Sequence, residues 1–571
     1  MKKSLVLLIG FIVISSGCAA PTPQSVSPMG NYSGAPQSDS IASSGDTYNT
    51  PQKSNILTQP SGSAPTAMAS TAPNANMMSK EMTQQDMALQ RPNYNTEEYS
   101  NIIENPFIEV VKSPLSTFSI DVDTASYSNI RRYIESKQAP PKGSVRIEEM
   151  INYFTYDYPQ PTGNDPFSIN MEMSNAPWNK EHKLVSIGLQ GKKIAKENMP
   201  ISNLVFLIDT SGSMSGSIEM LKESFKLLVN QLREQDRVSI VTYAGSAGLV
   251  LDSTSGANKS KIIEAIDRLQ SGGSTAGGAG INLAYKVAKD NFIKNGNNRV
   301  ILATDGDFNV GVSSEAELVS MIEKKREEGT FLSVLGFGMG NYKDSKMEQL
   351  ADKGNGNYAY IDSIKEAKKV FVEQMAGTVL PIAKDVKLQL EFNPTKVKSY
   401  RLIGYENRKL NNEDFNNDKK DAGEMGAGHS VTALYELTMA GSNETTTKID
   451  DLKYQENVIK TDAFKTDELM TVKFRYKEPN EDQSKLITKT LQNNSNDFNQ
   501  TSDNFRFASS VAGFGLLLRD SQYKGNINLQ SIQEMAQKSK GQDIEGYRAD
   551  FIKMLDIYQS IKDRPQASYN Y

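Results

Sequence analysis

The stretch LVFLIDTSGSMSG, residues 204–216, decides the fold of the middle of the chain. An apolar run ends abruptly at Asp209, and small, hydroxyl-bearing and glycine residues follow it at once. A short apolar run that ends in turn residues is consistent with a strand buried on both faces. The polar residues after it either cap the next helix or bind something.

Strand and helix patterns continue to alternate from this stretch to about residue 380. The expected strands are 203–209, 236–245, 298–307, 330–338 and 356–363, and the expected helices are 217–232, 260–269, 278–293, 315–329 and 365–379. This alternation predicts an α/β domain over 200–380 with a doubly wound, mostly parallel sheet and helices on both faces. Ligands of such sheets bind beyond the carboxyl ends of the strands.

Three polar features fall on these strand ends or on the loops that face them. Asp209, Ser211 and Ser213 follow the first strand, Thr275 lies in the glycine-rich loop SGGSTAGGAG (271–280), and Asp305 ends a later strand in TDGD. Taken singly, each is explained by a helix cap or a turn. Taken together, they offer two carboxylates and three hydroxyls without nitrogen or sulfur. Such oxygen ligands suit Mg²⁺, with Mn²⁺ or Ca²⁺ as alternatives.

The pattern D-x-S-x-S, a later threonine and a strand ending in T-D-G resembles the metal-ion-dependent adhesion site of von Willebrand factor type A (VWA) domains. The resemblance implies that Ser211, Ser213 and Thr275 coordinate the ion directly or nearly so. It implies that Asp209 and Asp305 act mostly through water. In that family a carboxylate from a protein partner fills the remaining position, so the resemblance implies a partner-binding protein.

Other functions fit the sequence less well. A nucleotide-binding P-loop needs a lysine that the loop 271–280 lacks. The segment FSIDVDTAS (118–126) partly matches the start of a haloacid-dehalogenase-type phosphatase, but no strand–helix series follows it. We therefore expect Asp121 and Asp123 to be surface or capping residues. His182 and His429, the two histidines, lie outside 200–380. Without a base or nucleophile constellation, the chain is not expected to be an enzyme.

Composition narrows the class further. A length of 571 residues suits two or three domains. The net charge is −5, with acidic and basic residues interleaved, so nucleic acid is not an expected partner. The one cysteine, Cys18, excludes a disulfide within the chain.

The first eighteen residues, MKKSLVLLIGFIVISSGC, have the features of a bacterial export signal. Two lysines precede an apolar core at 5–14, which is too short to span a bilayer comfortably. Small residues before Cys18 resemble the lipobox of bacterial lipoproteins, in which the cysteine is acylated, although Ser15 stands where that family usually has an aliphatic residue. The alternative is a plain cleaved signal with an incidental cysteine.

The segment after the predicted signal, 19–96, is rich in Ser, Pro, Asn, Gln and Thr, and we expect a disordered tether. Ala-Ala-Pro, rather than aspartate, follows Cys18, and this resembles the default for transfer to the outer membrane of Gram-negative bacteria. The sequence therefore predicts a lipid-anchored protein of the cell envelope.

Two regions flank the VWA-like domain. Residues 97–199 are predicted to mix helices and strands, and 381–571 to be β-rich and then helical. Our hypothesis is that 166–195 and about 384–477 form one β-sandwich into which 200–380 is inserted. The flanks PLSTFSIDVDTASYSNIRR (114–132) and VRIEEMINYF (145–154) resemble those of bacterial VWA-domain lipoproteins that carry a C-terminal domain of unknown function.

The sequence leaves two functions open. The first is an envelope lipoprotein that binds a protein partner through a metal-dependent acidic contact. The second is a structural or assembly scaffold of the envelope, in which the metal only stabilises the fold.

Overall fold

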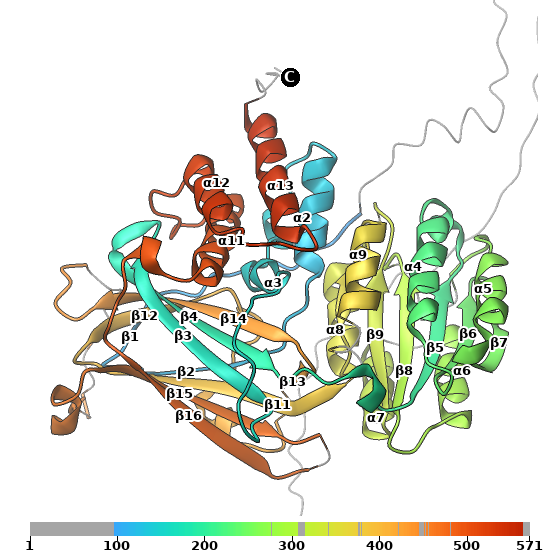
Figure 1. Cartoon of the computed structure of the whole chain (residues 1–571), viewed down its shortest axis with the longest axis horizontal. Helices are drawn as coiled ribbons and strands as arrows, with labels where there is room; N and C mark the ends of the chain where they lie inside the picture. The colour runs from blue at the N-terminus through green and yellow to red at the C-terminus, as the bar shows by residue number, and fades with distance from the viewer. Residues whose placement is uncertain are drawn as a thin grey trace, which may run out of the picture. The chain divides into compact units, whose positions relative to one another are not determined.

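The computed structural model describes most of the chain after residue 95 (Figure 1). The predicted signal peptide, the lipidation residue Cys18 and the tether up to residue 95 lie outside the described residues. The described ranges are 96–275, 277–306, 315–340, 342–374, 377, 380–420, 422–444, 450, 453–454, 456–479 and 481–563.

The middle of the chain forms a six-stranded sheet, as the sequence predicts. The strand order is β10 (Tyr358–Tyr360), β9 (Thr330–Gly336), β8 (Asn297–Thr304), β5 (Ser202–Asp209), β6 (Arg237–Tyr243) and β7 (Ala247–Ser255). All neighbours are parallel except β6 and β7. The chain continues from β5 to β6 on one side and later returns to β8 on the other. The crevice between β5 and β8 is therefore the topological switch point of the sheet.

Helices cover both faces of this sheet, which confirms the doubly wound α/β fold. One face packs against α4 (Ile218–Gln231), α5 (Lys259–Asp267) and α9 (Ile364–Lys368). The other face packs against α6 (Gly277–Asp290), α7 (Glu315–Glu327) and α8 (Asp344–Lys353). Both faces of β5 are buried, because Leu204 and Phe206 point to one helix layer and Val205 and Leu207 to the other.

The structure corrects several predicted elements of this domain. The edge strand β7 and the helix α8 were not predicted, because their short, partly polar sequences carry a weak periodic signal. The helix expected over 365–379 is not one regular α-helix: α9 ends at Lys368, a π-helical turn follows at Lys369–Glu373, and residue 377 is again helical, while 375–376 and 378–379 lie outside the described residues.

Two further sheets pack face to face beside this domain (Figure 1). The first has the order β1 (Ile108–Glu109), β12 (Val397–Ile403), β14 (Ser430–Met439), β4 (Asn179–Gly191) and β3 (Phe167–Ala176). The second has the order β13 (Gly423–Gly426), β11 (Pro381–Phe392), β15 (Glu468–Lys477) and β16 (Ser484–Gln492), and β2 (Leu115–Ser119) also pairs with β11.

Both sheets contribute side chains to one hydrophobic core, so they form a β-sandwich. Its strands come from both sides of the six-stranded domain: β3 and β4 precede that domain, and β11 follows it. This is the insertion that the sequence suggests. The sandwich extends beyond the predicted segments, because β2 pairs with β11 and β16 pairs with β15.

A helical layer covers the outer face of the first sheet. It joins α2 (Ala125–Glu135) and α3 (Ile147–Asn152) to the C-terminal helices α11 (Asp503–Arg519), α12 (Leu529–Lys538) and α13 (Tyr547–Lys562). Trp178 lies in this core with 1% of its surface exposed, and its indole Nε1 donates to Glu436 Oε1 at 2.9 Å.

The surface or capping role expected for Asp123 is wrong, and His182 is buried as well. His182 lies in β4, and its ring nitrogens contact Glu436 and Glu444, each at 2.6 Å. Asp123 neither caps α2 nor lies on the surface. It is 4% exposed, accepts a hydrogen bond from Tyr358 N at 2.8 Å and pairs with Arg408. Both residues are buried because the sandwich and the helices close over segments that look polar in isolation.

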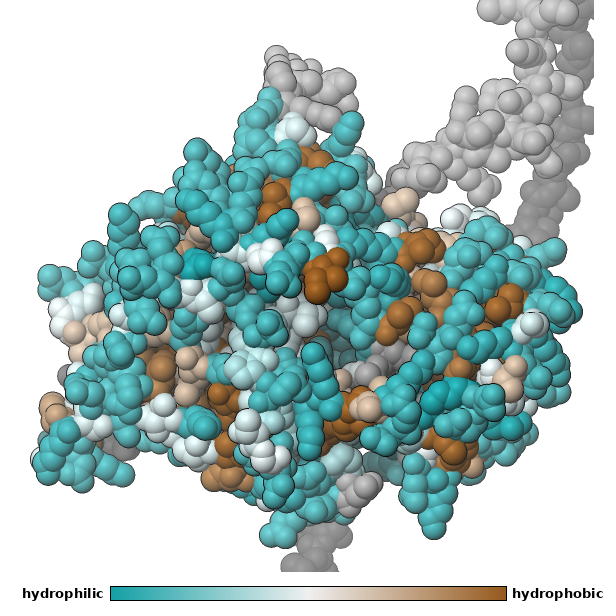
Figure 2. All heavy atoms as spheres, viewed as in Figure 1, coloured by the Kyte–Doolittle hydropathy of each residue, from teal (hydrophilic) through white to brown (hydrophobic). Residues whose placement is uncertain are grey.

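The face of the molecule in Figure 2 is mostly hydrophilic, with separate hydrophobic residues scattered over it. Among the described residues, no helix combines the length and the apolar character that crossing a membrane requires.

Candidate metal centre

The two predicted acidic residues lie at the switch point of the six-stranded sheet. Asp209 is the last residue of β5, and Asp305 directly follows β8. The two strands are parallel neighbours in which Ile208 pairs with Ala303, so their carboxyl ends meet at the same edge. Both side chains are buried, with 0% of Asp209 and 1% of Asp305 exposed.

Hydrogen bonds hold the Asp209 carboxylate from both sides. Ser211 N donates to Oδ1 at 2.9 Å, while Tyr243 OH and Thr304 Oγ1 donate to Oδ2 at 3.0 and 3.1 Å. Tyr243 and Thr304 are not among the residues that the sequence motif predicts. Each stands at the carboxyl end of a strand that neighbours β5, and this position was the signal that could have found them.

The two serines of the motif also lie together. Ser211 Oγ and Ser213 Oγ are 3.0 Å apart, with Ser211 buried and Ser213 exposed. Adjacent oxygen ligands at about 2.1 Å from an octahedral Mg²⁺ are separated by about 3 Å. The spacing of the two hydroxyls therefore fits a pair of neighbouring ligands.

The glycine-rich loop that carries Thr275 is attached to the serine loop through its backbone. Gly272 N donates to Thr210 O at 2.7 Å, and Gly212 N donates to Gly273 O at 3.1 Å. Thr275 itself is half-buried. The structure thus brings the loops of Ser211 and Thr275 to the edge at which Asp209 and Asp305 lie.

A fourth loop closes over the same edge. Gly338 follows β9 with a φ of +80°, and a Cβ at this position would lie 3.2 Å from Ser217 Oγ and 3.4 Å from the Asp305 Cβ. A glycine is suited here because the left-handed backbone and the close approach both disfavour a side chain. Met339, the next residue, is 67% exposed at the rim.

The electrostatics of the site favour a cation. Burial raises the pKa of Asp209, and the nearby Asp305 raises it further, against the lowering effect of the hydrogen bonds from Ser211. Among the described residues, no lysine or arginine forms an ion pair with Asp209. No cluster of three or more histidine, cysteine, aspartate or glutamate side chains suited to a metal occurs in the described part of the chain. The oxygen set at this edge differs from such clusters, because hydroxyls supply most of its donors, and it fits a hard divalent ion.

Comparison with known families agrees with this architecture. The model described as von Willebrand factor type A domain matches residues 203–373, and the model described as von Willebrand factor matches 93–186. The model described as "Uncharacterized protein YfbK, C-terminal" matches 377–561. The uncharacterized protein YfbK of Escherichia coli (strain K12) is 44% identical over 483 residues, which is 83% of each chain. The chain belongs to the YfbK family.

Other similarities are more distant. Human inter-alpha-trypsin inhibitor heavy chain H3 is 25% identical over 269 residues, which are 43% of this chain and 30% of that protein. The solved structure of a von Willebrand factor type A protein from Catenulispora acidiphila has 17% identity and a TM-score of 0.37, and covers 70% of this chain and 91% of that one. The YfbK-like sequence thus extends through both flanks, whereas the heavy chain shares only part of the chain.

Proposed function

We propose that this YfbK-family chain is a lipid-anchored envelope protein that binds a protein partner through a divalent metal at the VWA domain. The observation that carries the proposal is the convergence of Asp209, the two serine hydroxyls, the Thr275 loop and Asp305 on one edge of the sheet. Its function would be binding rather than catalysis.

Ser211, Ser213 and Thr275 would hold the ion directly, and Asp209 and Asp305 through water. A bound ion would supply an electrophilic position that accepts a carboxylate from the partner. The protein's own contribution is positioning. Hydrogen bonds from Tyr243 and Thr304 hold Asp209 in place, so little reorganisation is needed when an ion arrives.

The test is capture of binding partners from an envelope extract by the wild-type chain, with Mg²⁺ or with EDTA. Asp209→Ala and Thr275→Ala should abolish the divalent-dependent binding and leave the fold largely intact. Ser215→Ala is the matched control, because Ser215 is exposed in the same turn but lies outside the motif. Binding that survives both EDTA and the two substitutions would defeat the proposal, and metal-independent oligomerisation would favour a scaffold instead.

Membrane attachment is a separate part of the proposal and has its own test. Acyl chains on Cys18 would bury enough methylene groups for stable attachment. The wild-type protein should partition into the detergent phase, and Cys18→Ser should release it into the aqueous phase. A plain cleaved signal would leave the wild type and the variant equally soluble. Attachment at the outer membrane, rather than the inner one, is checked by membrane fractionation.

A further inference from the structure

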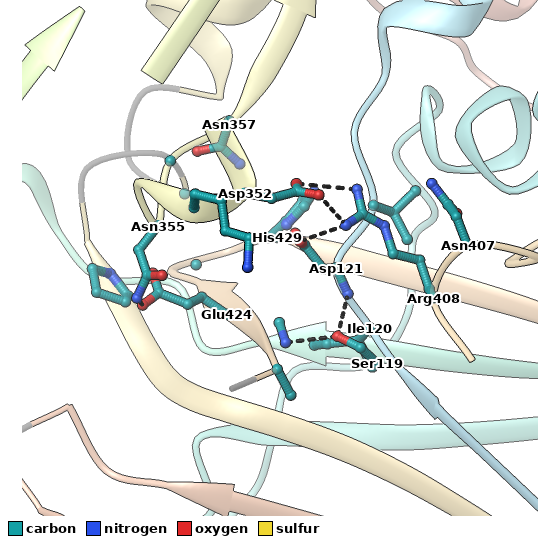
Figure 3. A pocket seen from close by; sticks show the side chains of 18 of the residues that line it. Ser119, Ile120, Asp121, Asp352, Asn355, Asn357, Asn407, Arg408, Glu424 and His429 are labelled. Atoms are coloured by element: carbon teal, nitrogen blue, oxygen red, sulfur yellow. Dashed lines mark hydrogen bonds and ion pairs between the residues drawn. The ribbon is translucent and has the colours of Figure 1, made fainter. Parts of the chain in front are cut away.

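A second polar site lies between the six-stranded domain and the β-sandwich (Figure 3). It is a cavity of about 350 Å³ that opens to solvent. The six-stranded domain contributes Arg299, Asp352 and Asn355–Asn357, and the sandwich side contributes Ser119, Arg408–Leu410 and Gly423. This volume lies in the range of small-molecule sites.

Arg299, near the start of β8, is the unusual residue of this cavity. It is 2% exposed and lines the cavity, yet it has no carboxylate ion pair among the described residues. In the described part of the chain, the four other buried arginines each pair with a carboxylate at 2.5–2.9 Å: Arg131 with Asp362, Arg146 with Glu348, Arg401 with Glu436 and Arg519 with Glu406. A buried charge without a partner is unfavourable, so Arg299 calls for an explanation.

The polar contacts of Arg299 leave much of its guanidinium unused. Nη1 donates to Ser333 Oγ at 2.8 Å, while Nε has no hydrogen-bond partner among the residues that the structure describes. Glu424 attracts it only from beyond ion-pair distance, and Glu424 Oε1 accepts instead from Asn355 Nδ2 at 3.0 Å. Burial lowers the pKa of Arg299 to about 10, so the group still carries its charge at neutral pH.

Of the other basic residues around the cavity, some form ion pairs with carboxylates and others do not. Figure 3 shows the Arg408 guanidinium joined to the carboxylates of Asp121 and Asp352, so this cation is already compensated. Lys409 and Lys420 are exposed at the cavity, and in the part of the chain that the structure describes neither has an ion pair. The described lining carries five basic side chains and three carboxylates, Glu424 among the latter, so its net charge is positive.

We propose that this cavity binds a small anion that presents a carboxylate or a phosphate group to Arg299. The planar guanidinium can donate two parallel hydrogen bonds to either group. Lys409 and Lys420 attract the anion at the entrance. The amides of Asn355 and Asn357 and the half-buried imidazole of His429 line the remainder of the cavity and suit polar substituents of the ligand.

The test is isothermal titration of the whole purified chain with inorganic phosphate and, separately, with succinate. Sodium chloride at equal ionic strength is the reference. EDTA is present throughout, so the result does not depend on the metal site or on the function proposed for it. The wild type should bind one of the two anions saturably, and which one it binds separates a phosphate-bearing ligand from a carboxylate-bearing one.

Arg299→Met should weaken this binding at least about tenfold, because a charge-assisted hydrogen bond in a buried site is lost. Lys420→Gln should weaken it less and make it less dependent on salt. The matched control is Arg237→Met at the exposed start of β6, two strands away in the same sheet, which should leave binding unchanged. No saturable binding of either anion, or equal binding by Arg299→Met, would overturn the proposal.

If Arg299→Met does not fold, crystals of the wild-type chain soaked in arsenate decide the matter, because arsenate is located by its anomalous signal. An arsenate within hydrogen-bond distance of the Arg299 guanidinium supports the site. An arsenate found only elsewhere, or none, overturns it.

Discussion

The two ends of β8 differ in the charge of their buried residues and in the segments of the chain that form the site around them. At the carboxyl end, Asp305 and the neighbouring Asp209 are buried acids at an edge suited to a cation. Near the amino end, Arg299 is a buried cation that faces a cavity without an ion-pair partner in the described residues. The acidic end is built by loops of one domain, whereas the basic end needs the sandwich to close it. One strand thus contributes residues to two sites. The composition of the first site is set by loops within one domain, and that of the second by the packing of two domains.

The largest change in stability is expected at Arg131, a buried arginine that has the carboxylate partners that Arg299 lacks. Arg131 pairs with Asp362 at 2.5 Å and with Glu366 at 2.7 Å, and both carboxylates are buried. Arg131→Met leaves two buried acids uncompensated and should lower the free energy of unfolding by about 3–5 kcal/mol. Urea denaturation measures this loss. A loss below about 1 kcal/mol would break the contrast with Arg299.

Next in size is a pH effect beside the acidic end, where Glu97 Oε1 accepts from Gly340 N at 2.9 Å. Burial alone would raise the pKa of Glu97, but hydrogen bonds from Arg132, Tyr133 and Gly340 outweigh it and lower the pKa to about 2. A lowered pKa stabilises the fold above the unfolded-state pKa, and this contribution is lost as the pH falls toward 2.

Glu97→Gln should therefore cost about 2 kcal/mol of stability at pH 7, and the difference from wild type should shrink between pH 4.5 and pH 2. Denaturation at a series of pH values measures it. Glu98→Gln is the matched control, since the neighbouring Glu98 is exposed. A difference that stays constant with pH would show that the Glu97 charge is not responsible.

A smaller effect tests the acidic end itself. Mg²⁺ at ten times its dissociation constant should stabilise the wild type by about 1.4 kcal/mol through mass action. Ser213→Ala should remove most of this stabilisation, and Ser215→Ala should keep it. Thermal unfolding with and without EDTA measures both. If all three proteins respond equally to Mg²⁺, the ion binds somewhere other than this edge.

The smallest effect is expected for Arg299→Met in the absence of added anions. Removal of a buried cation that has no ion-pair partner among the described residues should leave the free energy of unfolding unchanged or raise it by up to about 1 kcal/mol. Arg131→Met under the same conditions is the comparison. A loss for Arg299→Met as large as that for Arg131→Met would show that the protein itself compensates Arg299, and the two ends of β8 would then differ less than we infer.

Much of the α/β domain could be predicted from sequence, because its signals are local. The apolar run that ends at Asp209 and the alternation of strands with amphipathic helices specify a parallel sheet, and the order of the strands follows from short connections. The candidate metal residues were found for the same reason, since each follows a strand or lies in a glycine-rich loop. The elements β7 and α8 were not predicted from the sequence, because such short segments carry too weak a periodic pattern.

The flanks were harder, because their partners lie far away in sequence. Nothing local in PLSTFS indicates that Leu388 of β11 will pair with Phe118 of β2. Similarly, the local sequence does not show that β4, which carries His182, pairs with β14, or that Asp123 forms an ion pair with Arg408. Pairings separated by hundreds of residues leave no periodic trace in either segment.

By itself, the sequence determined the doubly wound sheet and the set of oxygen donors at its carboxyl edge, because strand ends and glycine loops are local features of the chain. Only the tertiary structure decided which charges are compensated. The sequence does not distinguish Arg131 from Arg299, yet Arg131 pairs with two carboxylates and Arg299 lines a cavity. The physical reason is that the energy of a buried charge depends on the groups that other segments bring within a few ångströms of it.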